Sequence, residues 1–195
     1  MTSLSRAELR RLLGLGDRGE SSYIVDAERL EGDLRIRHFR CGEDQIPAVS
    51  MAPADSGLNA PALLYCHAHG NAYGIGKSEV LEGRPALQEP PLAQVIARTG
   101  WTVFCIDMPG FGARQSQGHE SALAKSAHWY GQTLLGQMVN DQLLALEVLV
   151  DAVRPSGIAT LGISMGGTLA YLVAALCDDI AATAHFCVFA IGECR

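Results

Sequence analysis

Short apolar runs alternate with amphipathic stretches over most of this chain. Four runs are apolar at nearly every position, as in strands buried on both faces: residues 62–66, 101–106, 158–163 and 181–189. Segments with helical periodicity lie between or beside them, at residues 92–98, 134–153 and 166–176. This alternation predicts an α/β fold, a three-layer α/β/α sandwich with a mostly parallel central sheet.

The pattern differs before residue 60. Ser5 and Glu8 have the spacing of a capping box, which predicts a short helix that ends at the glycines after Leu13. Residues 34–39 alternate between apolar and polar, and residues 46–51 offer a partner strand, so we expect an antiparallel ribbon at one edge of the sheet. We assign residues 1–30 to an N-terminal helix and lead-in, and residues 31–195 to the α/β domain.

Composition narrows the classes of function. The 195 residues fit one domain, and 15 Lys and Arg against 21 Asp and Glu give a net charge of −6 without any basic run. We therefore expect no binding to nucleic acid or to an anionic membrane through charge. No apolar stretch reaches 18 residues, and the N-terminus lacks the apolar core of a signal peptide, so we expect a cytoplasmic protein without a membrane span.

The six cysteines are scattered along the chain without a C-x-x-C pair, and the six histidines are dispersed. Cys66 and Cys105 lie inside apolar runs, where a free cysteine behaves as a small hydrophobic residue. We therefore expect reduced thiols, no disulfide framework, no metal site and no cofactor.

The most specific motif is Gly-Ile-Ser-Met-Gly at residues 162–166, between a predicted strand and a predicted helix. It fits the G-x-S-x-G nucleophile elbow, whose turn is so tight that a Cβ on either glycine would clash. Ser164 is then forced into a strained backbone conformation, with its hydroxyl projecting from the sheet edge. The N–H of Met165 would face the oxygen that becomes negative during acyl transfer.

Three loops together resemble the α/β-hydrolase superfamily. His-Gly at residues 69–70 looks like the oxyanion-hole loop of that superfamily, residues 107–112 look like the loop after its fourth strand, and residues 162–166 match its nucleophile elbow. The match spans about residues 33–190. Within the superfamily, the chain is most similar to dienelactone hydrolases and acetyl xylan esterases.

The resemblance implies a serine hydrolase of small-molecule carboxylic esters, or of related acyl compounds, that works through an acyl-enzyme without a cofactor. Ser164 would be the nucleophile, and the backbone N–H groups of Asn71 and Met165 would form the oxyanion hole. His67 is interpreted as a histidine that organises the loop, because in the family order the base follows the nucleophile. The supporting positions are His69, Gly70, Gly162 and Gly166.

The family order of serine, then acid, then histidine is not completed in this chain. Asp178 and Asp179 fall at the far end of the helix after Ser164, His185 is expected to pack within a strand, and Glu193 is expected to be a solvated tail residue. We therefore expect a chain truncated at its C-terminus, without the last strands and helices and without the triad histidine and acid. Such a chain should hydrolyse esters weakly or not at all.

If the order of strands follows the family, the strand at residues 181–189 becomes a sheet edge with bare apolar faces. Unpaired N–H and C=O groups on such an edge invite pairing with another chain. We therefore expect homodimerisation or aggregation through this edge.

Two other classes of function stay open. Residues 70–78 resemble a phosphate-binding P-loop and residues 107–110 match D-x-x-G, but five residues rather than four separate Gly70 from Gly76, which breaks the phosphate cradle. The other class is a non-catalytic binding protein on a hydrolase scaffold. Two aromatic side chains are interpreted as packing groups and one arginine as an exposed surface residue: Trp129, Tyr130 and Arg114.

Overall fold

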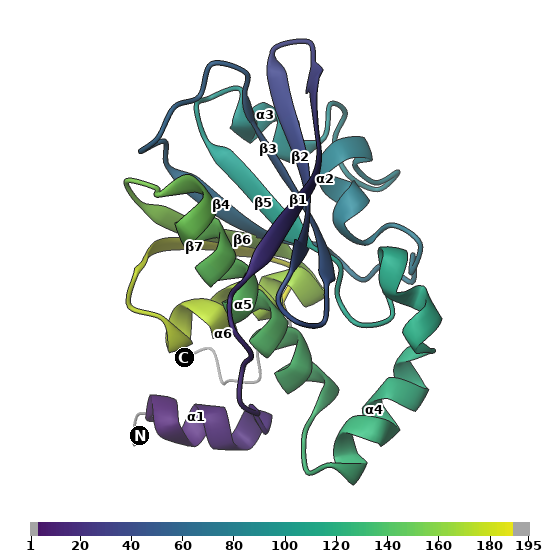
Figure 1. The fold of residues 1–195 in the computed structure, drawn as a ribbon. Helices are drawn as coiled ribbons and strands as arrows, with labels where there is room; N and C mark the ends of the chain where they lie inside the picture. Colours follow the sequence, from purple (N-terminus) through teal and green to yellow (C-terminus); the bar gives the residue numbers. More distant parts are fainter. Residues whose placement is uncertain (1–3, 189–195) are drawn as a thin grey trace, which may run out of the picture.

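The computed structural model describes residues 4–188. Within them, a seven-stranded sheet has the order β1-β2-β3-β5-β4-β6-β7 and carries helices on both faces (Figure 1). The strands are β1 (Tyr23–Glu31), β2 (Leu34–Cys41), β3 (Ile46–Pro53), β4 (Ala62–Cys66), β5 (Thr102–Ile106), β6 (Ile158–Ile163) and β7 (Ile180–Phe186). The helices are α1 (Arg6–Leu13), α2 (Glu79–Glu82), α3 (Leu92–Ala97), α4 (Glu120–Trp129), α5 (Leu134–Val153) and α6 (Met165–Leu176), with 3₁₀ turns η1 (Gly76–Ser78) and η2 (Gly112–Gln117).

The sheet combines a parallel part with an antiparallel part. Strands β5, β4, β6 and β7 run parallel to one another. Strands β1, β2 and β3 form an antiparallel ribbon, and β3 joins it to the parallel part by pairing antiparallel with β5. The predicted α/β class, with a parallel sheet and an antiparallel ribbon beside it, is confirmed.

The ribbon has one strand more than the sequence analysis predicts. Residues 23–31, which the sequence analysis assigns largely to the lead-in, form β1 and pair with β2 along its whole length. β1 is the outermost strand and is exposed at every position after Tyr23. Because neither face of β1 is buried, its sequence lacks the alternation of apolar and polar residues that reveals a half-buried strand.

Each face of the sheet has its own hydrophobic core. Leu64 and Phe104 belong to the core beneath α5 and α6, whereas their neighbours Leu63 and Val103 belong to the core beneath α2 and α3. Successive residues of a strand point to opposite faces, so a strand in the middle of three layers must be apolar at every position. The continuous apolar runs in the sequence follow from this burial.

The N-terminal helix α1 is attached to the side of the sheet that α5 and α6 cover. Its predicted capping box is present, since the Ser5 N–H donates to the Glu8 carboxylate at 2.8 Å and the Ser5 side chain accepts from the Glu8 N–H. The Thr133 hydroxyl, which caps α5, donates to the carbonyl oxygen of Leu13 at 2.6 Å. This bond ties the end of α1 to the start of α5.

Strand β7 forms the other edge of the described sheet, as predicted, but it is exposed along most of its length. His185 is exposed and its ring centroid lies 5.8 Å from that of Tyr171, so the expectation that it packs within the strand is wrong. Trp129 and Tyr130 are 88% and 76% exposed, so their interpretation as packing groups is also wrong. Trp129 is the last residue of α4 and Tyr130 is its C-cap, and this helix projects from the body of the molecule (Figure 1).

Among the helices of residues 4–188, none combines the length and the apolar character that crossing a bilayer requires.

Candidate active site

Ser164 lies in the turn between β6 and α6. Its backbone has φ 58° and ψ −121°, and its side chain is exposed. The Ser164 N–H donates to the carbonyl oxygen of Phe186 at 2.8 Å, which fixes the turn against the end of β7. A positive φ is unfavourable for a residue with a Cβ, so the turn holds Ser164 in a strained conformation. This is the geometry that the G-x-S-x-G spacing predicts.

The two glycines of the motif lie where no side chain fits. A Cβ on Gly162 would overlap the carbonyl group of Gly166, and a Cβ on Gly166 would overlap the carbonyl oxygen of Cys66. The elbow therefore closes on itself and packs against the end of β4. Glycine at both positions is a steric requirement of the turn.

Met165 is the first residue of α6, directly after Ser164. Within residues 4–188, its N–H donates to no backbone carbonyl. Because the first N–H groups of a helix have no partner within the helix, this N–H is free to bind an anion beside the Ser164 hydroxyl.

The loop after β4 carries His67, which is buried and bound to backbone on both sides of its ring. The Met108 N–H donates to His67 Nε2 at 3.2 Å, and His67 Nδ1 lies 3.1 Å from the carbonyl oxygen of Ala68. Nε2 must therefore be the unprotonated nitrogen, and Nδ1 donates. Burial lowers the pKa of His67, which favours this neutral form. The geometry agrees with a histidine that organises the loop.

His69 links the same loop to α4. Its Nε2 lies 3.0 Å from a carboxylate oxygen of Glu120, which also accepts a hydrogen bond from the Tyr73 hydroxyl at 3.1 Å. The bond to His69 is the main reason that the pKa of Glu120 is lowered. On the other side of the ring, the Asn71 N–H donates to His69 Nδ1 at 3.0 Å. The N–H that the resemblance implies for the oxyanion hole is therefore engaged within its own loop.

The sequence analysis missed a buried ion pair next to this loop. Glu79 and Arg84 have side chains only 1% and 7% exposed, and Arg84 Nε donates to Glu79 Oε2. The Tyr65 hydroxyl donates to the other carboxylate oxygen at 2.7 Å. Glu79 lies in α2 and Arg84 lies beyond its end, so no helical spacing rule connects the two and the sequence gives no signal of the pair.

The phosphate-binding interpretation of residues 70–78 does not fit the structure. The Asp107 carboxylate is fully buried and accepts hydrogen bonds from the Lys77 N–H, the Lys77 ammonium and the Ala113 N–H, at 2.7, 2.7 and 3.0 Å. The lysine that a P-loop would direct at phosphate thus neutralises a buried carboxylate. This pair fastens the loop after β4 to the loop after β5.

A cavity of about 570 Å³ opens beside the elbow. Met165, His69 and Glu120, the first residue of α4, form part of its wall. The opposite wall is apolar and comes from the first turns of α5: Leu134, Leu135 and Met138. The cavity next to Met165 is therefore largely apolar.

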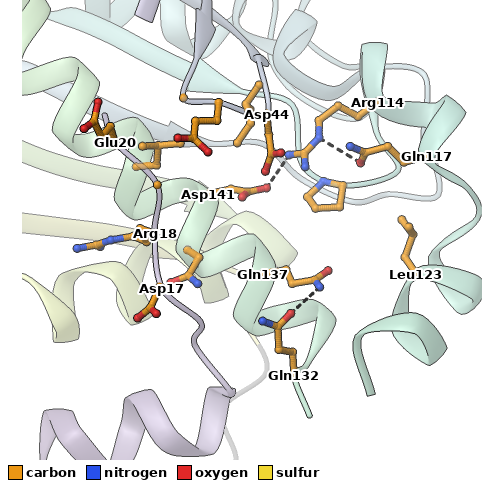
Figure 2. A pocket seen from close by; sticks show the side chains of 17 residues that line it. Asp17, Arg18, Glu20, Asp44, Arg114, Gln117, Leu123, Gln132, Gln137 and Asp141 are labelled. Carbon is orange, nitrogen blue, oxygen red and sulfur yellow. Dashed lines mark hydrogen bonds and ion pairs between the residues drawn. The ribbon is translucent and has the colours of Figure 1, made fainter. Parts of the chain in front are cut away.

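Arg114 is not the exposed surface residue that we expected. Its side chain is 11% exposed, forms an ion pair with Asp141 of α5 at 2.6 Å, and donates to the carbonyl oxygen of Asp107 at 3.0 Å. Figure 2 shows it on the wall of a polar pocket that also includes Asp44 and Gln137. Met165 and Ser164 do not line this pocket, so it is separate from the elbow.

Among residues 165–188, none forms a hydrogen bond with the Ser164 hydroxyl as an acid or base of a triad would. Asp178 lies beyond the C-terminal end of the 12-residue α6, about 18 Å along the helix axis from Ser164, and forms an ion pair with Arg6. Glu193 lies outside the described residues. Within residues 4–188, no side chain forms a hydrogen bond with the Ser164 hydroxyl, and no three His, Cys, Asp or Glu side chains gather as metal ligands.

Comparison with known proteins identifies the family of the fold. A family model for the alpha/beta hydrolase fold matches residues 61–187. The protein named "Putative hydrolase YtaP" of Bacillus subtilis (strain 168) is 36% identical over 194 residues. The alignment covers 96% of this chain but 64% of that relative, so this chain spans less than two thirds of the relative's length.

Solved structures show the same fold. The "putative acetyl xylan esterase" of Bacteroides fragilis NCTC 9343 has a TM-score of 0.73 at 16% identity, covering 91% of this chain and 51% of its own. Acetyl Xylan Esterase 1 of Thermoanaerobacterium sp. JW/SL YS485 has a TM-score of 0.63 at 17% identity, covering 91% of this chain and 56% of its own. With the elbow, the sheet order and the family model in agreement, the chain belongs to the α/β-hydrolase fold family.

Proposed function

We propose that this chain carries the nucleophile and part of the oxyanion hole of a serine hydrolase that acts on small carboxylic esters or related acyl compounds. The observation that carries the proposal is the backbone of Ser164, held at φ 58° with its side chain exposed between β6 and α6. Strain of this kind costs on the order of 1–3 kcal/mol and is concentrated at functional sites. Membership of the hydrolase family supports the class of reaction.

In the proposed reaction, Ser164 Oγ bonds to the ester carbonyl carbon, and its proton passes to a base. The carbonyl oxygen becomes an oxyanion, which the free N–H of Met165 stabilises by about 3 kcal/mol. Collapse of this intermediate breaks the bond to the alcohol, which leaves with a proton, and Ser164 remains acylated. Water then attacks the acyl group, releases the carboxylic acid and restores the serine.

The second donor in this proposal is the Asn71 N–H, supported by His69 and Gly70. Since this N–H donates to His69 Nδ1 at 3.0 Å, it must turn from the ring toward the oxyanion when substrate binds. The exchange of a neutral acceptor for an anionic one favours that movement, because hydrogen bonds to charged groups are roughly twice as strong.

We also propose that the 195-residue chain hydrolyses esters only weakly. The Ser164 hydroxyl has no hydrogen-bonded base within residues 4–188, and a serine hydroxyl without a base is a weak nucleophile near neutral pH. This proposal concerns the chain itself and leaves the activity of a longer relative untouched.

The nucleophile is tested by reaction with a fluorophosphonate, followed by intact mass and peptide mapping. We expect slow addition of one phosphonyl group to Ser164 and none in the Ser164→Ala variant, with Ser126→Ala as a matched control on the exposed face of α4. Labelling at another residue, or no labelling at all, would contradict the proposal. The second result would favour a non-catalytic binding protein on the same fold.

The weakness of the reaction is tested with p-nitrophenyl acetate. We expect the rate with the wild-type chain to lie close to that with Ser164→Ala. Rapid turnover that disappears in Ser164→Ala would show that the chain supplies its own base, and the proposal of weak activity would be wrong.

A further inference from the structure

Besides binding each other, the buried Glu79 and Arg84 side chains form hydrogen bonds with the backbone of the loop after β4. Glu79 Oε2 accepts from the Ala68 N–H at 3.1 Å, and the Arg84 guanidinium donates to the carbonyl oxygens of Ala68 and His69. Both backbone groups of Ala68 are thus held by a charged side chain. Hydrogen bonds to charged partners are stronger than those between neutral groups, so this is a firm attachment for an irregular segment.

The loop also fits closely around the arginine. A Cβ on Gly70 would lie 2.8 Å from a terminal nitrogen of Arg84, and Gly70 has φ 52°. The guanidinium therefore packs directly against the backbone of His69 and Gly70. A side chain at position 70 would push the arginine away from the two carbonyl oxygens that it binds.

The held segment is in contact with the nucleophile elbow. The carbonyl oxygens of Cys66 and His67 lie against Gly166, two residues after Ser164, so closely that no Cβ fits between them. The end of β4 is therefore fixed against the elbow. The distance from the Ala68–Asn71 backbone to Ser164 then depends on the path that the loop takes after Cys66. The Glu79–Arg84 pair fixes the loop two residues beyond that point.

Stability alone is a weak reason for this pair. Removing two charges from water costs several kcal/mol per ion, and buried ion pairs can often be replaced by apolar residues without loss of stability. Here the charged groups do something that apolar residues could not, because they bind two carbonyl oxygens and one N–H of an irregular backbone.

From these contacts we infer that Glu79 and Arg84 are positioning residues, which hold the loop of residues 67–72 at the distance from Ser164 that the oxyanion hole requires. The inference rests on the proposed acyl chemistry for its catalytic consequence. Its structural part, the local fixation of the loop by the pair, can be measured separately.

The test uses the full 195-residue chain and the variants Arg84→Gln, Arg84→Lys and Tyr65→Phe. Lysine keeps the charge but cannot reach both carbonyl oxygens, and phenylalanine removes only the hydroxyl that donates to Glu79. The control is Arg98→Gln, which breaks an exposed ion pair with Asp33. Hydrogen–deuterium exchange is followed in peptides covering residues 66–73 and, for comparison, β2 and β3.

We expect Arg84→Gln to accelerate exchange in residues 66–73 well beyond any change in β2 and β3, with smaller effects in the other two variants and none in the control. The maximal rate of phosphonylation of Ser164 should fall roughly 10- to 100-fold in Arg84→Gln, with little change in the half-saturating concentration of the probe. Arg84→Lys should restore part of that rate.

Equal acceleration of exchange across the whole sheet in Arg84→Gln and Tyr65→Phe would mean a general structural role and would overturn the inference. An unchanged phosphonylation rate in a variant with a loosened loop would also overturn it. If the wild-type chain is not phosphonylated, the proposed function fails, whereas local exchange confined to residues 66–73 would still support fixation of the loop by the pair.

Discussion

Gly166 packs so closely against the carbonyl oxygen of Cys66 that a Cβ at position 166 would overlap it, and would lie 2.7 Å from the carbonyl oxygen of His67. The elbow after β6 and the loop after β4 therefore share a contact made entirely of backbone. Backbone atoms cannot move aside as the end of a flexible side chain can, so this contact fixes the two halves of the candidate active site against each other.

We predict that Gly166→Ala destabilises the protein by roughly 3 kcal/mol or more, because the added carbon must separate β4 from the elbow. The measurement is the free energy of unfolding in urea. Gly57→Ala is the control, since no atom lies within 4 Å of a Cβ at that position, and we expect a change within about 0.5 kcal/mol. Equal unfolding midpoints for the two variants would show that the elbow is looser than the structure indicates.

The strain at Ser164 gives a second prediction. Glycine tolerates the backbone conformation of residue 164, so Ser164→Gly should be more stable than Ser164→Ala by about 1 kcal/mol or more. Thermal unfolding of the two variants measures the difference. At Ser126, in the exposed helix α4, the order should be reversed: Ser126→Gly should be less stable than Ser126→Ala, because glycine is unfavourable within a helix. A more stable alanine at position 164 would argue against a strained elbow.

The parts of the site that could be predicted from the sequence are those that local sequence determines. The elbow could be recognised because Gly162 and Gly166 are required by a turn of five residues, and the buried strands because burial on both faces leaves an apolar run. These are constraints between residues close in the chain. They apply regardless of which distant segments of the chain pack nearby.

The parts that could not be predicted depend on distant contacts. The Asn71 N–H is engaged because the ring of His69 is oriented by Glu120, 51 residues away. The burial of Arg114 depends on Asp141, 27 residues away on α5. No spacing rule connects such partners, so the sequence pattern predicts an exposed arginine at position 114, and that prediction is wrong.

Buried His67 makes stability depend on pH. Burial lowers its pKa below the ordinary value of 6.5, so below pH 6.5 the unfolded chain takes up a proton that the folded chain resists. The contribution of neutral, buried His67 to the free energy of unfolding is fully present above pH 6.5. It is lost progressively as the pH falls toward the folded-state pKa. Urea unfolding between pH 7.5 and about pH 5 should therefore show falling stability.

The variant His67→Asn should lose this part of the pH dependence, although it is less stable near neutral pH. His128→Asn, in an exposed position of α4, is the control and should keep the wild-type dependence. A wild-type dependence retained in His67→Asn would assign the effect to other groups.

Breaking the buried Asp107–Lys77 pair should lower the free energy of unfolding substantially. Asp107→Ala leaves the Lys77 ammonium and two backbone N–H groups without their acceptor, so we expect a loss of roughly 3 kcal/mol or more in the free energy of unfolding. Asp26→Ala removes an exposed partner of Arg40 and should leave the unfolding midpoint nearly unchanged. Similar midpoints for the two variants would contradict the anchoring role of Asp107.

The exposed edge at β7 predicts self-association of the chain. Within residues 4–188, β7 pairs with β6 alone, so no other described strand pairs with the N–H and C=O groups along its second side. Its exposed apolar residues include Ala184 and Phe186. Sedimentation velocity over a range of concentrations should show dimers or larger species. Ala184→Lys should weaken this association, because a lysine on an edge strand disfavours edge-to-edge pairing. Ala122→Lys adds the same charge on exposed α4 and should leave the association unchanged, whereas a wild-type chain that stays monomeric at all concentrations would contradict the prediction.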